Sequence, residues 1–208
     1  DPVPGILAAL LVVSIYGGIA LSVDFPKVAL GFQSDEATYY MMAHSLAQDG
    51  DLAYRREDLT RVWREFRSGP SGVFLKRGRD LDISLHARPP FLQIASRPDP
   101  DQDRLYYGKS FAYPLVAAPL VTIFGTNGFL VLHALLLGVM VLAGYLFLAT
   151  RMRSGIALVL SAGFLLASVA PTYFVWLTPE LFNLAAVLVG YFCWLYKLVA
   201  KDAPAPGF

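Results

Sequence analysis

Two adjacent acidic residues, Asp35 and Glu36, are the strongest candidates for chemistry in this sequence of 208 residues. They lie in residues 33–40 (QSDEATYY). A short turn separates this stretch from an uncharged run over residues 4–23, which is long enough to span a bilayer. Carboxylates just beyond a membrane exit are costly to place near lipid, which favours a functional role. A structural role also fits, because Ser34 is a suitable N-cap and acids in a first turn stabilise the start of a helix.

The composition is that of a membrane protein. Hydrophobic residues make up 56% of the chain and charged residues 16%, and the mean hydropathy is +0.51. The net charge of +1 gives no reason to expect a nucleic-acid partner. Residues 24–109 hold 26 of the 33 charged residues, whereas residues 110–196 hold only Arg151, Arg153 and Glu180. The chain therefore combines one span, one charged loop and a nearly uncharged half that we expect in the membrane.

We predict an all-α membrane protein with about four transmembrane helices and a large first loop. The predicted parts are a first transmembrane helix (1–23), an extracytoplasmic loop with amphipathic juxtamembrane helices (24–110), an interfacial helix (111–125), three transmembrane helices (126–201) and a tail (202–208). The last three spans are expected at 128–150, 156–176 and 180–198. Gly17 and Gly18 are small enough for close packing of the first helix. The two ends of the sequence suggest a fragment of a larger membrane protein.

The distribution of basic residues predicts the orientation. The basic pairs Arg151/Arg153 and Lys197/Lys201 are expected in the cytoplasm. Residues 111–125 are too few to span and contain two prolines, so they are predicted to lie at the interface. The 24–110 loop and the turn before Glu180 then share the opposite face. If residues 111–125 crossed the membrane instead, the two basic pairs would lie on the same face as the long loop. This arrangement is disfavoured, because residues 111–125 are too few to span.

An amphipathic helix is predicted within the loop, over residues 55–67. Its apolar residues follow helical spacing, and arginines surround them: Leu59, Val62, Trp63 and Phe66, with Arg55, Arg56, Arg61, Arg64 and Arg67. The pattern is typical of a helix on a membrane surface, and it also fits a helix packed on its own domain. A second helix is predicted over residues 35–48, and small strands over 72–75 and 91–94.

Possible metal ligands in the loop give weak signals. Asp99, Asp101 and Asp103 have the spacing that opens a calcium loop, but Arg104 and Ser110 stand where that loop needs glycine and glutamate, so we predict a solvated turn. Glu36, Tyr40 and His44 share one face of the predicted helix, and two ligands do not make a metal site. His133, within a span, is expected to bond a local carbonyl.

Glu180 is the one acidic residue in the apolar half of the sequence. Residues 178–180 (TPE) are a favourable helix start, so a structural role fits. The predicted orientation also allows carboxylates of the loop to reach Glu180. Both interpretations remain open on the residues alone.

Three short motifs occur in the order found in one enzyme superfamily. They are residues 34–40 (SDEATYY) after the first span, residues 106–115 (YYGKSFAYPL) leading into the interfacial helix, and residues 177–182 (LTPELF) at the last span. Together they resemble the N-terminal module of the GT-C glycosyltransferases, in the branch of protein O-mannosyltransferases and aminoarabinose transferases. Members of that superfamily usually have more spans and often a further soluble domain. Several relatives have proline where Ser110 follows Lys109.

The resemblance implies transfer of a sugar from a polyprenyl-phosphate donor to a lipid, glycan or protein acceptor, with inversion. It places the reaction on the periplasmic side of a bacterial inner membrane. Asp35 would be the general base, with Glu36 and Glu180 as further catalytic carboxylates. Lys109, Arg55 and Arg56 would face the leaving phosphate. Tyr39, Tyr40 and Tyr107 would bind the sugar, although tyrosines at a membrane interface are common in any case.

A divalent metal ion, Mg²⁺ or Mn²⁺, could share the stabilisation of the phosphate. Asp35, Glu36 and Glu180 would then be its ligands. The competing hypothesis is a non-catalytic membrane scaffold or lipid-phosphate-binding module that keeps the architecture without the activity. A transporter is less well supported, because the sequence shows no internal repeat and no charged residue in mid-span.

Overall fold

The structure, a computed structural model, describes residues 1–28, 32–77, 79–89, 92–98 and 104–201. Within them, three helical segments are long and apolar enough to cross a membrane: Val3–Ser22, Ala112–Leu148 and Glu180–Ala200. They correspond to α1 (Val3–Ser22), to α5 (Ala112–Phe124), η1 (Gly125–Asn127) and α6 (Gly128–Leu148) in succession, and to α8 (Glu180–Lys201). These segments agree with the prediction of a mainly α-helical membrane protein.

The span predicted at 156–176 is not one continuous helix. α7 (Ser154–Leu166) has 13 residues and is followed by a 3₁₀ turn, η2 (Ala170–Phe174). Pro171 has no N–H to donate, and its ring would clash with the carbonyl of Ala167 in a continued helix. The Ser168 hydroxyl also accepts a hydrogen bond from the Ala170 N–H at 3.2 Å. α7 alone is therefore shorter than a membrane span requires.

α1 and α6 pack against each other at two glycines, Gly5 and Gly138, which the sequence analysis did not identify. A Cβ on Gly138 of α6 would lie 2.4 Å from Val13 Cγ2, and one on Gly5 of α1 would lie 2.1 Å from the Tyr145 ring. Both positions thus need glycine for the present approach of the helices. Gly17 and Gly18, which were predicted to allow close packing, do not mediate it among the described residues, where a Cβ at either position would meet nothing within 4 Å.

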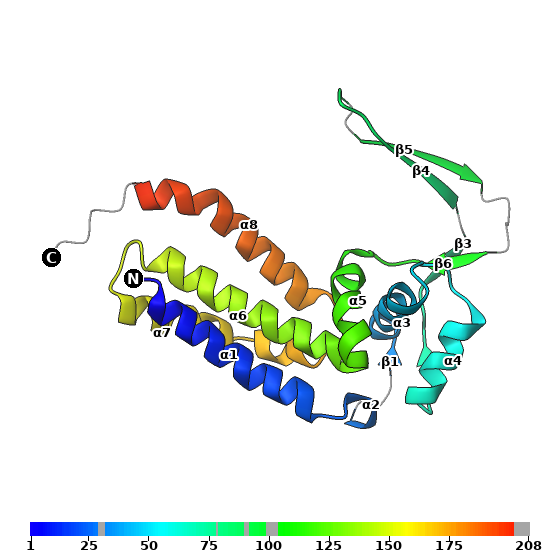
Figure 1. Cartoon of the computed structure of the whole chain (residues 1–208), viewed down its shortest axis with the longest axis horizontal. Helices are drawn as coiled ribbons and strands as arrows, with labels where there is room; N and C mark the ends of the chain where they lie inside the picture. The colour runs from blue at the N-terminus through cyan, green and yellow to red at the C-terminus, as the bar shows by residue number, and fades with distance from the viewer. Residues whose placement is uncertain (29–31, 78, 90–91, 99–103, 202–208) are drawn as a thin grey trace.

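α5 lies across the end of α6 and does not continue it (Figure 1). The direction changes at Gly125, whose φ of 59° favours glycine. Three residues later Gly128 approaches the backbone so closely that a Cβ there would lie 2.5 Å from the carbonyl of Leu120. This turn places α5 beside the loop that precedes it.

The loop between α1 and α5 contains both helices and strands. Its helices are α2 (Phe25–Val28), α3 (Asp35–Gln48) and α4 (Arg56–Glu65). Its strands are β1 (Phe32–Gln33), β2 (Pro70–Ser71), β3 (Leu75–Arg77), β4 (Arg79–Leu85), β5 (Leu92–Pro98) and β6 (Leu105–Tyr107). β1 pairs with β2 in parallel, and β3 with β6 and β4 with β5 antiparallel.

The loop is thus less helical than predicted, while its two longer predicted helices are present as α3 and α4. The aspartate turn at 99–103, part of the strand at 91–94 and the tail at 202–208 lie outside the described residues.

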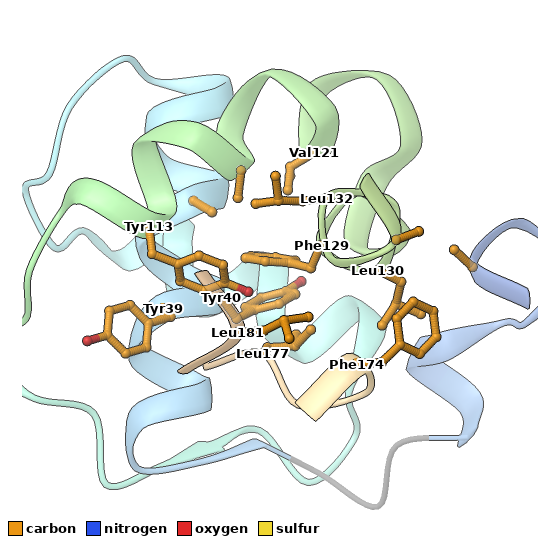
Figure 2. Packing of buried hydrophobic residues seen from close by; sticks show 14 of the residues in the cluster. Tyr39, Tyr40, Tyr113, Val121, Phe129, Leu130, Leu132, Phe174, Leu177 and Leu181 are labelled. Atoms are coloured by element: carbon orange, nitrogen blue, oxygen red, sulfur yellow. The ribbon is translucent and has the colours of Figure 1, made fainter. Parts of the chain in front are cut away.

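α3 forms the centre of the loop. Its residues from Ala37 to Ser45 are all buried, because α5 covers one side and α4 another. Tyr40, Tyr113 and Phe129 meet in this core, which Figure 2 shows together with Leu177 and Leu181 from the start of α8. The loop is thereby packed onto the ends of the membrane helices.

One end of the helix layer carries the loop. The C-terminal end of α1, the N-terminal ends of α6 and α8, and α3 gather there, while the N-terminus and the C-terminal end of α8 lie at the other end (Figure 1). Residues 34–36 and residues 177–180 are therefore brought together from opposite halves of the chain.

Candidate functional site

The backbone at Ser34 sets the position of the acidic pair. Ser34 has a φ of 55°, the one non-glycine residue with positive φ among the described residues, and this is a costly conformation. Its N–H donates to the carbonyl of Ser71 at 2.7 Å, and its carbonyl accepts from the Thr38 hydroxyl at 2.9 Å. That hydroxyl in turn accepts from the Phe74 N–H at 3.0 Å. The start of α3 is thus held by the β1–β2 pair.

The predicted N-cap at Ser34 does not form through its side chain. Its hydroxyl makes no capping hydrogen bond and lies 3.4 Å from Asp35 Oδ1 instead. The strained backbone explains this, because an N-cap normally has extended dihedral angles.

Asp35 forms an ion pair with Lys109. Asp35 Oδ1 lies 2.8 Å from Lys109 Nζ, and the side chains are 41% and 26% exposed, so solvent or a substrate can reach both. Lys109 Nζ also lies 4.0 Å from the centre of the Phe74 ring. The hydrogen bond to Asp35 raises the pKa of Lys109 above 10.5, and Lys109 therefore stays protonated at neutral pH. The geometry fixes one oxygen of Asp35 and leaves its carboxylate accessible.

Glu36 connects the loop with the start of α8. Its Oε1 accepts a hydrogen bond from the Leu177 N–H at 3.2 Å. Burial raises the pKa of the Glu36 carboxyl, the hydrogen bond from Leu177 lowers it, and the neighbouring Glu180 carboxylate raises it again. Glu180 itself is exposed in the first turn of α8. The two glutamates predicted to approach each other are close enough to interact.

Tyr39 lies between this group and the core. Its ring makes an edge contact with Tyr113 of α5, with 5.7 Å between centroids, and its side chain is 5% exposed. Burial raises the pKa of the Tyr39 hydroxyl, and the charge of Lys109 opposes this shift. The charges of Asp35 and Glu180 raise it further. The Tyr39 hydroxyl is therefore within electrostatic range of all three charged side chains.

All three tyrosines predicted to bind a sugar are buried, and Tyr40 and Tyr107 have no contact with the Asp35–Lys109 pair among the described interactions. Tyr40 is fully buried and packs against His44, Phe66 and Phe129. Tyr107 is 2% exposed and lies beside Tyr54 and the carboxyl of Asp58. Successive residues of a helix point in different directions, which is why Tyr39 reaches the site and Tyr40 does not.

The arginines predicted to face a phosphate have other surroundings. Arg55 pairs with Asp51 at 2.6 Å, and Arg56 is exposed at the start of α4. Arg61 lies at the centre of this region, 2.6 Å from Asp49 and 2.8 Å from Asp58. The structure thus brings Lys109 to the acidic residues and leaves Arg55 on a separate ion pair.

The carboxylates do not form a metal centre as they stand. Within the described ranges, no group of three or more His, Cys, Asp or Glu side chains is arranged to hold a metal ion. Asp35 is paired with Lys109, and Glu36 is bonded to the Leu177 N–H. Because metal-binding carboxylates converge on one point, Asp35, Glu36 and Glu180 would have to exchange these partners to hold a divalent cation, and the metal site stays a prediction.

Sequence reasoning missed the buried support behind Tyr39. Tyr113 Oη lies 2.8 Å from His133 Nε2, and His133 Nδ1 lies 2.8 Å from the carbonyl of Phe174. Because a carbonyl only accepts, Nδ1 carries the proton and the Tyr113 hydroxyl donates to Nε2. His133 therefore bonds a carbonyl from η2, distant in sequence and not local as predicted. This network joins α5, α6 and η2.

Phe74 and the Leu177 N–H are also missing from the predicted site. An apolar ring and a main-chain donor carry no pattern that marks them in a sequence. Comparisons of the chain with known protein families, with curated proteins and with solved structures gave no match.

Proposed function

We propose that the chain is the catalytic module of a glycosyltransferase that moves a sugar from a polyprenyl phosphate to an acceptor, with inversion. The resemblance in sequence motivates this proposal, and one observation carries it. An accessible carboxylate, Asp35, is held 2.8 Å from the ammonium group of Lys109, beside two further carboxylates at the loop end of the helix layer. This group combines a proton acceptor with a cation.

Asp35 is the proposed general base. The hydroxyl oxygen of the acceptor forms a bond to the anomeric carbon, and its proton passes to the free oxygen of the Asp35 carboxylate. The bond from the anomeric carbon to the phosphate oxygen breaks, and the phosphate leaves with the electron pair. Attack opposite the leaving group inverts the configuration, so no covalent enzyme intermediate is required.

Lys109 is the proposed electrostatic partner of the leaving phosphate. Protonation of Asp35 removes the negative charge that Lys109 balances in the free enzyme. The positive charge of Lys109 then becomes available at the moment when negative charge accumulates on the phosphate. The Asp35–Lys109 pair can thereby couple proton removal to departure of the leaving group.

Glu36, Glu180 and Tyr39 are proposed to hold hydroxyl groups of the sugar or acceptor. One oxygen of Glu36 is used by the Leu177 N–H, which orients the other. We propose a lipid, glycan or protein acceptor and a site on the extracytoplasmic side of a bacterial inner membrane. Four crossings, with the α7–η2 segment included, would place this end of the helices there.

Release of polyprenyl phosphate from a panel of lipid-linked sugars tests the proposal. Wild type, Asp35→Asn and Glu180→Gln are compared, with Glu57→Gln, an exposed residue of α4, as the matched loss of one charge. We expect wild type and Glu57→Gln to release polyprenyl phosphate at similar rates. The rate should fall by about a hundredfold or more in Asp35→Asn and by a smaller factor in Glu180→Gln.

Melting temperatures establish that the variants are folded. Normal release by Asp35→Asn would exclude Asp35 as the base. If no donor reacts with any variant while donors still bind, the chain is instead a lipid-phosphate-binding module without catalytic activity.

A further inference from the structure

A pocket of about 460 Å³ lies between α2 and the C-terminal end of α4. Its walls are Pro26 and Lys27 from α2 and residues 64–68, which end α4 and follow it. Three of these side chains are cations and one is an acid: Lys27, Arg64, Arg67 and Glu65. The pocket is separate from the Asp35–Lys109 pair, because Glu65 lies beside Thr126 and His44 near the far end of α3.

The acidic groups of this region are already engaged. Lys27 Nζ lies 2.5 Å from Asp24 Oδ2, and Glu65 accepts a hydrogen bond from the Thr126 hydroxyl. Arg64 and Arg67 are both exposed, and neither has an ion-pair or hydrogen-bond partner among the residues that the structure describes. Two guanidinium groups are therefore available at one concave site. An anion is the ligand that they would attract.

The position of the pocket indicates which anion. The apolar run of α1 ends at Ser22, and α2 begins three residues later. The Asn127 side chain donates to the carbonyl of Val23 at 2.7 Å, which fixes η1 at the same level. Trp63, one residue before Arg64, is 53% exposed, as is common for tryptophan at a membrane interface. The pocket thus lies just beyond the end of α1, where the headgroups of a membrane crossed by α1 would begin.

We propose that this pocket binds the phosphate headgroup of an anionic membrane lipid. Arg64 and Arg67 donate to the phosphate oxygens, for which the fork geometry of guanidinium is suited. Lys27 lines the opposite wall, where its ammonium group is paired with Asp24. Pro26 gives the pocket apolar surface that the glycerol end of the lipid can contact. The site would anchor the loop against the membrane independently of any reaction at Asp35.

Binding of dihexanoyl-phosphatidylglycerol to the protein in a neutral detergent tests this inference. Calorimetric titration compares wild type with Arg64→Gln/Arg67→Gln. The matched control is Lys76→Gln/Arg77→Gln, which removes two exposed charges from β3 of the same loop. We expect the arginine variant to bind at least about tenfold more weakly and the control to change less than about threefold. Equal melting temperatures are expected, since both arginines lack partners.

A second arm uses inorganic phosphate alone. We expect inorganic phosphate to bind far more weakly than the short-chain lipid, because it makes no apolar contact with Pro26. Equal weakening in the two double variants would overturn the site, since general electrostatic attraction would then explain binding. Inorganic phosphate and the lipid could instead bind wild type with equal affinity, and both could lose binding in Arg64→Gln/Arg67→Gln. That result would overturn the assignment to a lipid, because the site would then bind a free anion.

Discussion

Gly128 controls the turn that places α5 beside α3, and replacing it by alanine should weaken the whole loop end of the molecule. A Cβ at residue 128 would lie 2.5 Å from the carbonyl carbon and oxygen of Leu120 and from the Val121 nitrogen. These are backbone atoms, so no rotamer change can relieve the contact. α5 must instead move away from α6 by most of an ångström.

The expected cost follows from this contact. Overpacking in a close-packed interior costs about 1–3 kcal/mol, and contacts with backbone belong at the upper end. Gly163 in α7 is a matched control, because a Cβ there meets nothing within 4 Å. Alanine in that helix interior should stabilise by about 0.5–1 kcal/mol. The same chemical change is thus expected to have opposite signs at the two positions.

Thermal unfolding in detergent measures both variants. At about 2–4 °C per kcal/mol for a chain of this size, Gly128→Ala should melt about 2–12 °C below wild type. Gly163→Ala should melt at or slightly above wild type. Equal melting temperatures for Gly128→Ala and Gly163→Ala would refute the claim that the α5–α6 turn needs glycine at residue 128. The displacement should also reduce the proposed sugar transfer, because Tyr113 of α5 supports Tyr39.

Two further predictions concern the charged group. Lys109→Met should lower polyprenyl-phosphate release strongly yet cost less than about 1 kcal/mol of stability, because the pair with Asp35 is partly exposed; unchanged release would remove Lys109 from the mechanism. Burial, together with Glu180, raises the pKa of Glu36 above 4.5, so the native state binds this proton more tightly than the unfolded chain. Stability from this group is present below pH 4.5 and lost as the pH rises through the raised pKa. The melting temperature of Glu36→Gln, relative to that of wild type, should therefore increase as the pH rises from 4.5 to neutrality. A difference in melting temperature that is independent of pH would contradict this.

Much of the helical framework could be predicted because hydropathy and helix length depend on local sequence. The helix at 35–48 follows from Asp35 at its start and the Asp49-Gly50 stop, and the structure has it as α3. The approach of Glu180 to Glu36 is expected from two crossings between them, a count that includes the α7–η2 segment and stays a prediction.

Other features depend on tertiary packing and could not be predicted. Tyr39 and Tyr40 are both buried, and their tertiary neighbours distinguish them: Tyr39 contacts Tyr113 of α5, whereas Tyr40 packs against Phe66 and Phe129. Whether a glycine packs closely depends on the facing helix, which separates Gly138 from Gly17. The positive φ of Ser34 arises from its bond to Ser71, on a strand 37 residues away. Pro171 could have predicted that α7 ends early. The prediction of one span over residues 156–176 relied on hydropathy instead.

Turnover of a bound donor by wild type and Asp35→Asn tests the central claim most directly. Each protein is saturated with a lipid-linked sugar that wild type uses, donor affinity is measured in the same samples, and release of polyprenyl phosphate is followed in a single turnover. Asp35 as general base predicts unchanged donor affinity and a release rate lower by about a hundredfold or more. Release by Asp35→Asn at the wild-type rate, with the donor equally bound, would contradict the proposed chemistry.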